Sequence, residues 1–363
     1  MKITKQERRG RRALQVRARI REQGSPRLTV HRTPRHIYAQ LFVADGSKVA
    51  IRDRKLNTQD VYPIGQTPYR SITEIEREQG RRTTTTLTQT GRRSLLPIHP
   101  QARVYGAPII SGHVGADAAA CLLAVDMADE DRLVAVMDIG TNTELLLGNR
   151  HRILAASCPA GPAFEGGAIT CGMPGLDGAI ERVAISDAGR VDLGVIGAGA
   201  PEGICGSGLV DLLSELRRTE RMNALGRFEN GDDRVWLDAD RRLFVSEADV
   251  NELAQAKGAN VAGLQVVFQE YGARFDDVEV FYLAGGFGRH LQPDAARRIG
   301  LIPDLPDSRI VPIGNAAIEG ASLMLRSVTA RRALERTVDR VEHCRLETHP
   351  GFFDFFVDGC QFS

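Results

Sequence analysis

VMDIGTNTELLLGN, residues Val136–Asn149, is the stretch that decides the fold. An apolar run, Leu133–Met137, has the length of a buried strand, a glycine-containing turn follows it, and Glu144–Leu147 continues as a second strand. Further along the chain, apolar strand-like runs such as Val280–Ala284 alternate with helical patterns such as Ser246–Tyr271. The sequence therefore predicts an α/β fold in which helices flank a mixed sheet.

The turn between the first two strands has the composition of an anion site. Gly140 lets a phosphate approach the backbone without a Cβ in the way, and consecutive N–H groups in such a turn form a nest for an anion. The hydroxyls of Thr141 and Thr143 add donors, and Asp138 at the strand end would hold Mg²⁺ through water. The turn suits a nucleotide with its cation, and a plain β-hairpin turn with a cap is the alternative.

Three other segments suggest contacts to a nucleotide. The glycines of Leu283–Gly288 follow a strand and would let a flat adenine lie against the backbone, unless they only form a tight turn. Gly203–Gly208 leads into a helix whose N-terminus would attract an anion, unless its serine is simply the N-cap. A lysine of the helix Ser246–Tyr271 could reach the nucleotide, although helix lysines mostly face solvent. The candidate residues are Gly206, Ser207, Lys257, Gly285, Gly286 and Gly288.

The chain is nearly neutral overall, but its first part is strongly basic. The 363 residues carry a formal charge of +1, whereas Met1–His36 contains twelve lysines and arginines against two glutamates. The six cysteines are scattered, with no zinc spacing and no ferredoxin-like run. With neither a secretory signal nor an apolar run long enough to span a bilayer, we expect a cytoplasmic protein without membrane contact.

Several long motifs occur together and in one order along the chain. They are RVYGAPIISGHVGADAAACLLA (103–124), VMDIGTNTELLLGN (136–149), AGPAFEGGAITCGM (160–173), GICGSGLVDLL (203–213), YLAGGFGRHLQPDAARRIGLIPD (282–304), IGNAAIEGA (313–321) and FFDFFVDGCQF (352–362). Together they closely resemble the C-terminal region of the reductive activators of corrinoid proteins, and the resemblance runs from about residue 56 to Ser363.

In that family an actin-like ATPase (ASKHA) domain with ribonuclease-H-like lobes binds ATP between two lobes, and an iron–sulfur domain reduces the cobalt of a corrinoid protein. The resemblance implies ATP and Mg²⁺ as ligands, a corrinoid protein or related metalloprotein as partner, and a homodimer. The matching residues are Asp138, Gly140, Thr141 and Asn142 for the second phosphate loop and Gly285, Gly286 and Gly288 for the adenosine loop.

Two parts of that family find no match in this chain. No iron–sulfur motif occurs, so we expect no iron–sulfur cluster in this chain and no electron supply of its own. No second Asp-x-Gly-Thr-Thr loop precedes Asp138, because the run Thr83–Thr86 lacks the aspartate and the glycine. We therefore expect the first lobe to be missing or cut short, which leaves no residue to assign to catalysis.

The basic N-terminus resembles a different family. RRALQVRARIREQGSPRLTVHRTPRHIYAQLFVADGSKVA (11–50) is similar to the first part of bacterial ribosomal protein L18, which binds 5S rRNA. Arginines on a helix and a strand suit contacts to RNA phosphates, and a solvated basic tail is the alternative. The candidate RNA contacts are Arg8, Arg9, Arg11, Arg12, Arg32 and Arg35.

The sequence thus predicts three parts: a basic L18-like segment (1–50), a linker or partial first lobe (51–100) and an actin-like nucleotide-binding region (101–363). Three functions follow from them, namely ATP binding related to corrinoid activation, rRNA binding through the N-terminus, and a non-enzymatic scaffold. The junction near residue 50 is compatible with a natural fusion, a recombined frame or a chimera.

Overall fold

The computed structural model describes residues 27–32, 36–42, 49–51, 56–57, 86–90, 92 and 99–362, except 198, 230, 239, 287 and 289. The chain forms two compact units, one of Met1–Thr84 with Thr88–Tyr105 and one of Thr85–Leu87 with Gly106–Ser363. The division predicted at residue 50 stays a prediction. None of the helices in the described part of the chain is long and apolar enough to cross a membrane.

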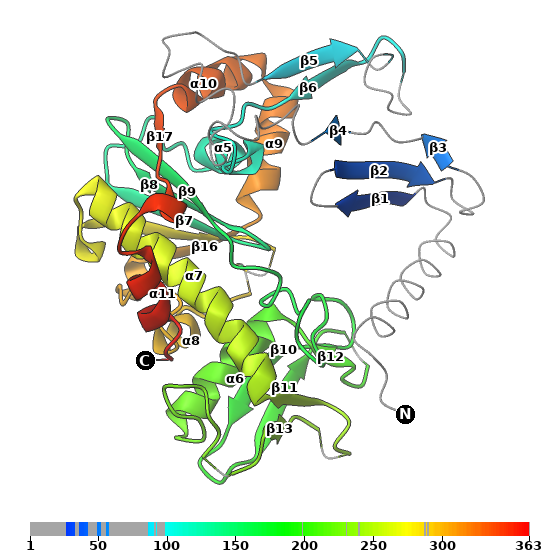
Figure 1. Ribbon diagram of the computed structural model, residues 1–363, viewed down its shortest axis with the longest axis vertical. Coiled ribbons are helices and arrows are strands. Elements are labelled where there is room, and N and C mark those ends of the chain that lie inside the picture. The colour runs from blue at the N-terminus through cyan, green and yellow to red at the C-terminus, as the bar shows by residue number, and fades with distance from the viewer. Residues whose placement is uncertain are drawn as a thin grey trace. The chain divides into compact units, whose positions relative to one another are not determined.

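The described strands of the N-terminal part form antiparallel pairs (Figure 1). In a four-stranded sheet, β2 pairs with β1, β3 and β4, and β5 pairs with β6 in a separate two-stranded sheet. The bounds are β1 (Arg27–Arg32), β2 (His36–Phe42), β3 (Val49–Ile51), β4 (Leu56–Asn57), β5 (Leu87–Thr90) and β6 (Arg103–Gly106).

The second unit is built on a six-stranded mixed sheet with the order β16-β15-β7-β8-β9-β17. The strands are β7 (Val134–Ile139), β8 (Thr143–Gly148), β9 (Ile153–Cys158), β15 (Val280–Ala284), β16 (Ile310–Gly314) and β17 (Val341–His343). β7, β8 and β9 form an antiparallel meander, whereas β15, β16 and β17 run parallel to their neighbours. The predicted α/β class with a mixed sheet is therefore confirmed.

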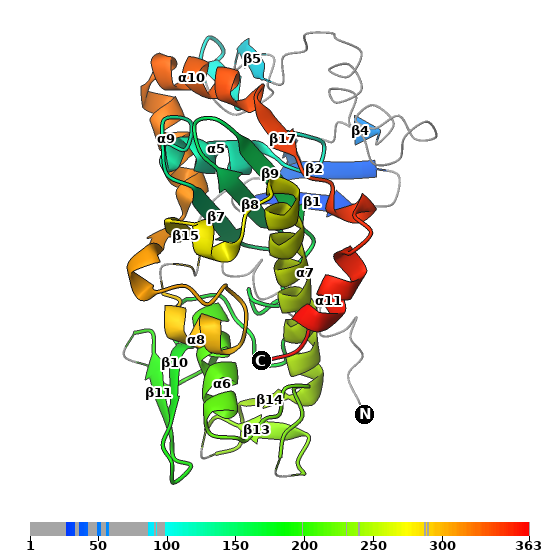
Figure 2. The ribbon, with the colours of Figure 1, turned by 90° about the vertical axis from the view of Figure 1, so that its left-hand side faces the viewer.

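Helices cover both faces of this sheet. α7 (Glu247–Tyr271) contacts β8 and β9, and α11 (Phe352–Gly359) lies alongside it, as Figures 1 and 2 show. α5 (Ala116–Ala124) contacts β7 and β8 and packs against α9 (Ala316–Arg326) and α10 (Val328–Val338).

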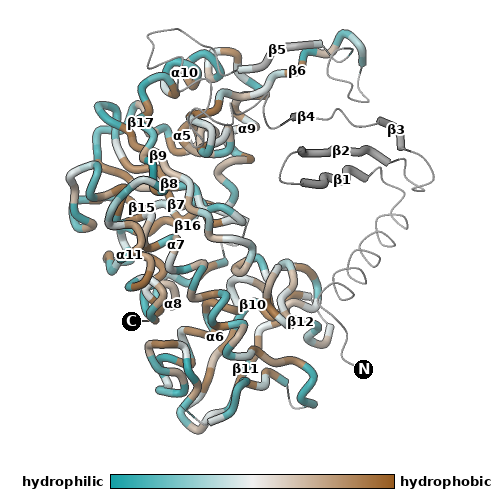
Figure 3. The backbone as a smooth tube through the Cα atoms, in the orientation of Figure 1, coloured by the Kyte–Doolittle hydropathy of each residue, from teal (hydrophilic) through white to brown (hydrophobic). Residues whose placement is uncertain are grey.

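The strand residues themselves show that these helices occupy opposite faces. Met137 and Leu145 belong to one hydrophobic cluster with residues of α7, whereas Val136 and Leu146 are buried outside that cluster. Successive side chains of a strand point to opposite faces, so α7 covers one face and α5 the other. Burial on both faces explains why β7 and β8 read as nearly continuous apolar runs, which Figure 3 shows as hydrophobic stretches of the backbone.

A smaller group of elements adjoins the sheet within the same unit. α6 packs against β10 and α8, and the β13–β14 hairpin leads into α7. The three-stranded sheet has the order β11-β10-β12. The bounds are β10 (Ala179–Ile185), β11 (Val191–Val195), β12 (Gly203–Ile204), α6 (Gly206–Arg218), β13 (Arg234–Trp236), β14 (Phe244–Ser246) and α8 (Pro293–Arg298), with short 3₁₀ turns at Phe275–Asp277, Asp307–Arg309 and Leu346–Thr348.

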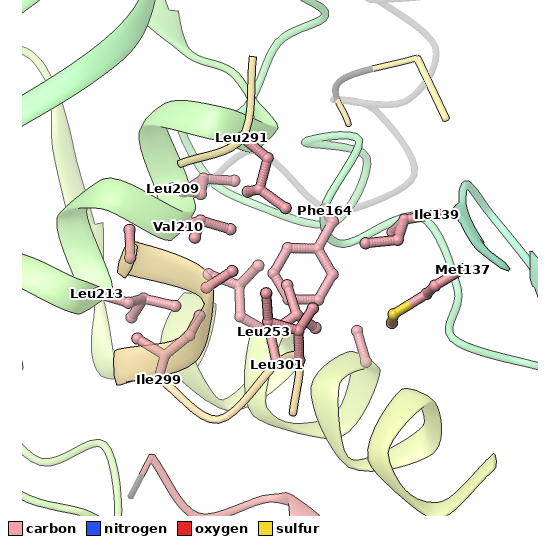
Figure 4. Close-up of a cluster of buried hydrophobic side chains, with 14 of the residues drawn as sticks. Met137, Ile139, Phe164, Leu209, Val210, Leu213, Leu253, Leu291, Ile299 and Leu301 are labelled. Carbon is pink, nitrogen blue, oxygen red and sulfur yellow. The ribbon is translucent and has the colours of Figure 1, made fainter. Parts of the chain in front are cut away.

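One hydrophobic cluster joins the sheet to this smaller group. Figure 4 shows the ring of Phe164 between Ile139 of β7, Leu209 of α6 and Leu253 of α7. Phe164 is 1% exposed, so the loop that carries it is held by apolar packing on several sides. The cluster therefore sets where the loop after β9 lies relative to the strand ends.

The start of α7 is stabilised by a reciprocal cap that also holds this loop. The Ser246 hydroxyl accepts from the Asp249 N–H at 3.2 Å, and the Asp249 carboxylate accepts from the Ser246 N–H at 2.9 Å. The second oxygen of that carboxylate accepts from the Thr170 N–H at 2.7 Å. Because one carboxylate serves both segments, the start of α7 and the loop 160–173 are tied together.

Candidate functional site

Two of the predicted glycine turns lie side by side at one end of the six-stranded sheet. β15 runs parallel to β7 with Ala284 opposite Asp138, so the turns that follow the two strands leave the sheet together. Gly285 has φ +110°, and a Cβ there would lie 2.3 Å from the Ile139 carbonyl oxygen. Glycine is required at this position because the two backbones approach too closely for a side chain.

The third predicted turn faces the same space. Cys205 is the N-cap residue of α6, and Gly206 and Ser207 form its first turn. Together with the ends of β7 and β15, this helix start surrounds a cavity of about 860 Å³. The sequence-predicted residues that line it are Asp138, Gly140, Thr141, Asn142, Gly206, Ser207, Gly285 and Gly286.

The cavity is rich in carboxyl groups. Among the lining residues that the structure describes there is no lysine or arginine and one histidine, His290. The carboxyl groups come from four separate segments of the chain, since two of them lie on the neighbouring strands β7 and β8, and are those of Asp117, Asp138, Glu144, Glu165 and Glu181. Negatively charged carboxylates that lie this close together repel one another, and a cation bound among them would reduce that repulsion. The cavity therefore favours a bound cation.

Two of these carboxyl groups lie at the sheet end, opposite each other in register. Asp138 accepts a hydrogen bond from the Cys121 thiol at 3.2 Å, and its pKa is raised by burial. Glu144 is 6% exposed, and burial and then the charge of Asp117 raise its pKa to about 8. The Ser157 hydroxyl donates to Glu144 Oε1 at 3.1 Å, while Oε2 has no partner among the described residues.

The other polar side chains lie around these two. The Thr141 hydroxyl donates to Glu165 Oε2 at 2.5 Å, which joins the β7–β8 turn to the loop after β9. His290 Nδ1 lies 3.8 Å from Glu181 Oε2, which joins the segment after β15 to β10. In the described part of the chain, no group of three or more His, Cys, Asp or Glu side chains is placed so that it could hold a metal ion.

Three candidate residues do not line the cavity. Thr143 is fully buried in β8, and the N–H of Gly288 donates back to the Gly285 carbonyl at 3.2 Å to close its turn. Lys257 corrects the sequence interpretation, because it reaches neither the cavity nor solvent. It is 1% exposed, with its Nζ 5.6 Å from the ring centre of Phe362, and burial lowers its pKa to about 8.

The predicted RNA contacts remain untested by the structure. Arg32 is the last residue of β1, but only its backbone is described. The other five predicted contacts, Arg8, Arg9, Arg11, Arg12 and Arg35, lie outside the described residues.

Sequence reasoning missed several residues that line the cavity. Glu181 lies outside all of the quoted motifs, and nothing in its immediate neighbours marks it. The other residues that were missed, Asp117, Glu165, His290 and Asn315, each lie within one of the quoted motifs, and this was the only signal that could have found them. Asn315 is the N-cap of α9, where its side chain accepts from the Ile318 N–H at 2.9 Å.

The arrangement of glycine turns around a cavity at the sheet end agrees with a family assignment. The family described as the C-terminal domain of RACo, the ASKHA domain, matches residues 132–363. The chain belongs to this family. A solved structure titled "Reductive activator for corrinoid,iron-sulfur protein" superposes on it with a TM-score of 0.73 at 24% identity, covering 94% of this chain and 66% of that one. The actin-like ASKHA fold is therefore confirmed for this member.

Two curated proteins of known role are similar to this ASKHA family member. One is the corrinoid activation enzyme RamQ of Eubacterium limosum, 32% identical over 292 residues, and the other is the [Co(II) methylated amine-specific corrinoid protein] reductase of Methanosarcina barkeri, 27% identical over 282. The matches cover 74% and 70% of this chain and 49% and 50% of the relatives. The chain thus spans about half the length of the curated relatives it matches.

A short stretch at the N-terminus matches a different protein. It is 69% identical over 39 residues to the large ribosomal subunit protein uL18 of Marinobacter nauticus, which covers 11% of this chain and 34% of that protein. The resemblance to ribosomal protein L18 is therefore confirmed over a short N-terminal stretch.

Proposed function

We propose that the cavity of the second unit binds ATP as its Mg²⁺ complex. The observation that carries the proposal is the convergence of three glycine turns on one cavity of about 860 Å³. The β7–β8 turn and the start of α6 offer backbone N–H groups to phosphates, and Gly285 and Gly286 leave room for a flat base. A volume of this size lies in the usual range of small-molecule sites, roughly 300–1,000 Å³.

The charge of the cavity makes the cation a requirement of this proposal. Those of the five lining carboxyl groups that are ionised would repel the phosphates of free ATP. Mg²⁺ bound to the phosphates cancels two of their negative charges and so weakens that repulsion, and Asp138 at the strand end would hold the cation through water. The protein's own contribution is then to orient the phosphates with backbone N–H groups and to receive the cation with its carboxylates.

The test is a calorimetric titration of the full chain with ATP, in the presence of Mg²⁺ and again with excess chelator. We expect saturable heat with Mg²⁺ only, and its loss in Asp138→Asn. Asp304→Asn is the matched control, since Asp304 is exposed and does not line the cavity. No saturable heat from the wild-type chain, or equal binding by Asp138→Asn, would reject the proposal.

The partner that we propose is a corrinoid protein or a related metalloprotein. The support comes from the relatives, whose names place their action on corrinoid proteins. If the affinity for the corrinoid protein changes when Mg-ATP is added, the chain, as a monomer or a homodimer, couples nucleotide binding to binding of its partner. If that affinity does not change with Mg-ATP, the chain acts as a non-enzymatic scaffold.

A second candidate function is binding to 5S rRNA through the basic N-terminal segment. The short match at 69% identity to uL18 favours it, as does the concentration of arginines before His36. Binding of this kind depends on phosphate contacts and is expected to be strongly dependent on salt. It would operate independently of the nucleotide cavity.

A further inference from the structure

A second cavity lies at the far end of α6 from the glycine turns. Its volume is about 610 Å³, and it shares no lining residue with the first cavity, which the glycine turns form. Figures 1 and 2 show α6 beside β10, β11 and β13, the elements that surround it. Because Ser207 begins α6 at the first cavity and Thr219 follows its end at the second, the two sites are separate.

The deep side of this second cavity is apolar. Ile185 and Leu216 are buried there, at 2% and 1% exposed. The half-buried members of this apolar surface are Val191, Val235 and Trp236. The Trp236 ring packs against that of Phe244 with ring centres 5.2 Å apart, so the indole is fixed in place. The cavity therefore has a preformed floor for apolar groups of a ligand.

The rim of the second cavity carries carboxyl groups. Glu220, Glu229 and Asp232 line it and are exposed. The Glu229 N–H donates to the Arg221 carbonyl at 3.0 Å, so Glu229 lies beside the residue that follows Glu220. Within the part of the chain that the structure describes, neither glutamate carboxylate forms an ion pair. The rim can therefore accept a cation that the protein itself does not supply.

Two arginines also line this cavity, and both have contacts within the protein. Arg234 donates to the two carboxylate oxygens of Asp233 at 2.8 and 3.1 Å and lies 5.0 Å from the ring centre of Phe244. A Cβ built on Gly189 would lie 2.1 Å from Nη2 of Arg221, so this guanidinium rests against the β10–β11 turn. Three carboxyl groups thus face two guanidinium groups, one of which Asp233 neutralises, and the cavity is acidic overall.

Glu220 has a backbone conformation that favours glycine. Its φ is +55°, and it follows the C-cap residue of α6, Thr219. Its N–H donates to the Arg217 carbonyl at 3.2 Å, and the Arg221 N–H donates to the Leu216 carbonyl at 2.9 Å. These two bonds form the Schellman motif, in which glycine is the usual residue at this position. A glutamate here costs stability, which indicates a use for its side chain at the rim.

We propose that the second cavity binds a basic, amphipathic peptide segment of a partner protein. Apolar side chains of the segment lie on the floor, and a lysine or arginine between them reaches Glu220 and Glu229. The aliphatic stems of lysine and arginine pack on apolar surface while their charged groups stay at the rim. The volume exceeds that of any single side chain, so it suits a segment of a few residues. This inference does not rest on nucleotide binding in the first cavity.

The probe is a synthetic peptide, Leu-Lys-Leu-Lys-Leu, acetylated and amidated at its ends, titrated into the full chain. A fluorescein-labelled copy gives the dissociation constant by anisotropy. Trp236 is the single tryptophan of the chain and lines the cavity, so a change in its emission with the unlabelled peptide locates the binding. We expect saturable binding that weakens as salt is added, because the rim charges are exposed to solvent.

Variants of the rim test the charge recognition. Glu220→Gln and Glu229→Gln should each raise the dissociation constant about threefold, the contribution of one exposed ion pair. Asp304→Asn is the matched control and should bind as the wild type does, since Asp304 is exposed and lines neither cavity.

Glu220→Gly separates a binding role from a structural one. It removes the carboxylate, so we expect peptide affinity to fall about threefold. It also relieves the left-handed conformation, which glycine adopts without steric cost, so the urea midpoint of unfolding should rise. A variant that loses affinity while its fold becomes more stable cannot owe that loss to unfolding.

Several results would overturn the peptide assignment. It is wrong if the basic peptide does not bind at millimolar concentration, if Leu-Glu-Leu-Glu-Leu binds as tightly, or if saturation leaves the Trp236 emission unchanged. It is also wrong if the double variant Glu220→Gln/Glu229→Gln keeps the wild-type affinity. Spermidine carries amines without apolar side chains, and if it displaces the peptide at equal concentration, the cavity is a polyamine site instead.

Discussion

Replacing Gly285 by alanine should destabilise the second unit and disrupt the end of the sheet that forms the cavity. Gly285 follows β15 with φ +110°, a backbone conformation that residues with a Cβ rarely adopt. The added Cβ would lie 2.3 Å from the carbonyl oxygen of Ile139 and 3.0 Å from its carbonyl carbon and amide nitrogen. These atoms are backbone atoms of a central strand, so they cannot rotate aside as a flexible side chain would.

The magnitude follows from two separate costs. Holding a non-glycine residue in a disfavoured conformation costs roughly 1–3 kcal/mol. Forcing extra volume into a packed contact costs roughly 1–3 kcal/mol more. We therefore expect the free energy of unfolding to fall by about 4 kcal/mol, which places Gly285→Ala among the more severe single substitutions.

The neighbouring glycine provides a matched control. Gly286 is exposed, and a Cβ there would meet no atom within 4 Å. Gly286→Ala should therefore change the free energy of unfolding by less than about 0.5 kcal/mol. The assay is urea unfolding followed by the fluorescence of Trp236, the single tryptophan of the chain, which lies in the second unit. Equal urea midpoints for the two variants would refute the inferred close approach of β15 and β7.

Two further predictions concern a buried acid and the basic segment. Burial raises the pKa of Asp211 to about 6, against partial relief from Arg182 at 3.9 Å and the Val183 N–H. Because the folded-state pKa lies above the ordinary value, this group's contribution to stability is lost as pH rises through about 4 to 6. Asp211→Asn should therefore flatten this pH dependence and raise the free energy of unfolding at pH 7 by about 1–2 kcal/mol, with solvent screening taken into account. If the free energy of unfolding differs between pH 4 and pH 7 as much in the variant as in the wild type, the prediction is wrong. If the N-terminal arginines contact 5S rRNA, the logarithm of the affinity should fall linearly with the logarithm of the salt concentration. The slope should be smaller in the double variant Arg8→Ala/Arg9→Ala, which has fewer phosphate contacts. A filter-binding series in which the affinity does not change with salt would exclude the RNA function.

The helices and strands that were predicted correctly are those for which the residues within the element, or directly beside it, indicate its type. Val280–Ala284 is both the predicted apolar run and the observed β15, because a strand buried on both faces is apolar throughout. The helix predicted over Ser246–Tyr271 is observed from Glu247, with Ser246 as its N-cap and Gly272 in the left-handed conformation after its end. Capping residues act within one turn of the helix, so they can be read from sequence.

Elements with weak local signals were not predicted. α10 buries Leu334 and Val338 on one side, but arginines occupy several of its other positions, and nothing in Val328–Val338 alone indicates a neighbour to pack against. Lys257 shows the same limit at a single residue. Its sequence environment is that of an exposed helix lysine, and it is buried because α11 and the segment after it, including Phe362, pack against α7.

The sequence by itself determined the α/β class, the glycine turns after β7 and β15, and the aspartate at the strand end, because each depends on neighbours a few residues away. Only the tertiary structure decided which of these residues share a cavity, and it added Asp117, Glu165, Glu181 and His290 from other segments. The physical reason is that proximity between distant segments is set by strand register and by the packing of the cluster around Phe164, and neither can be read from the residues beside each group.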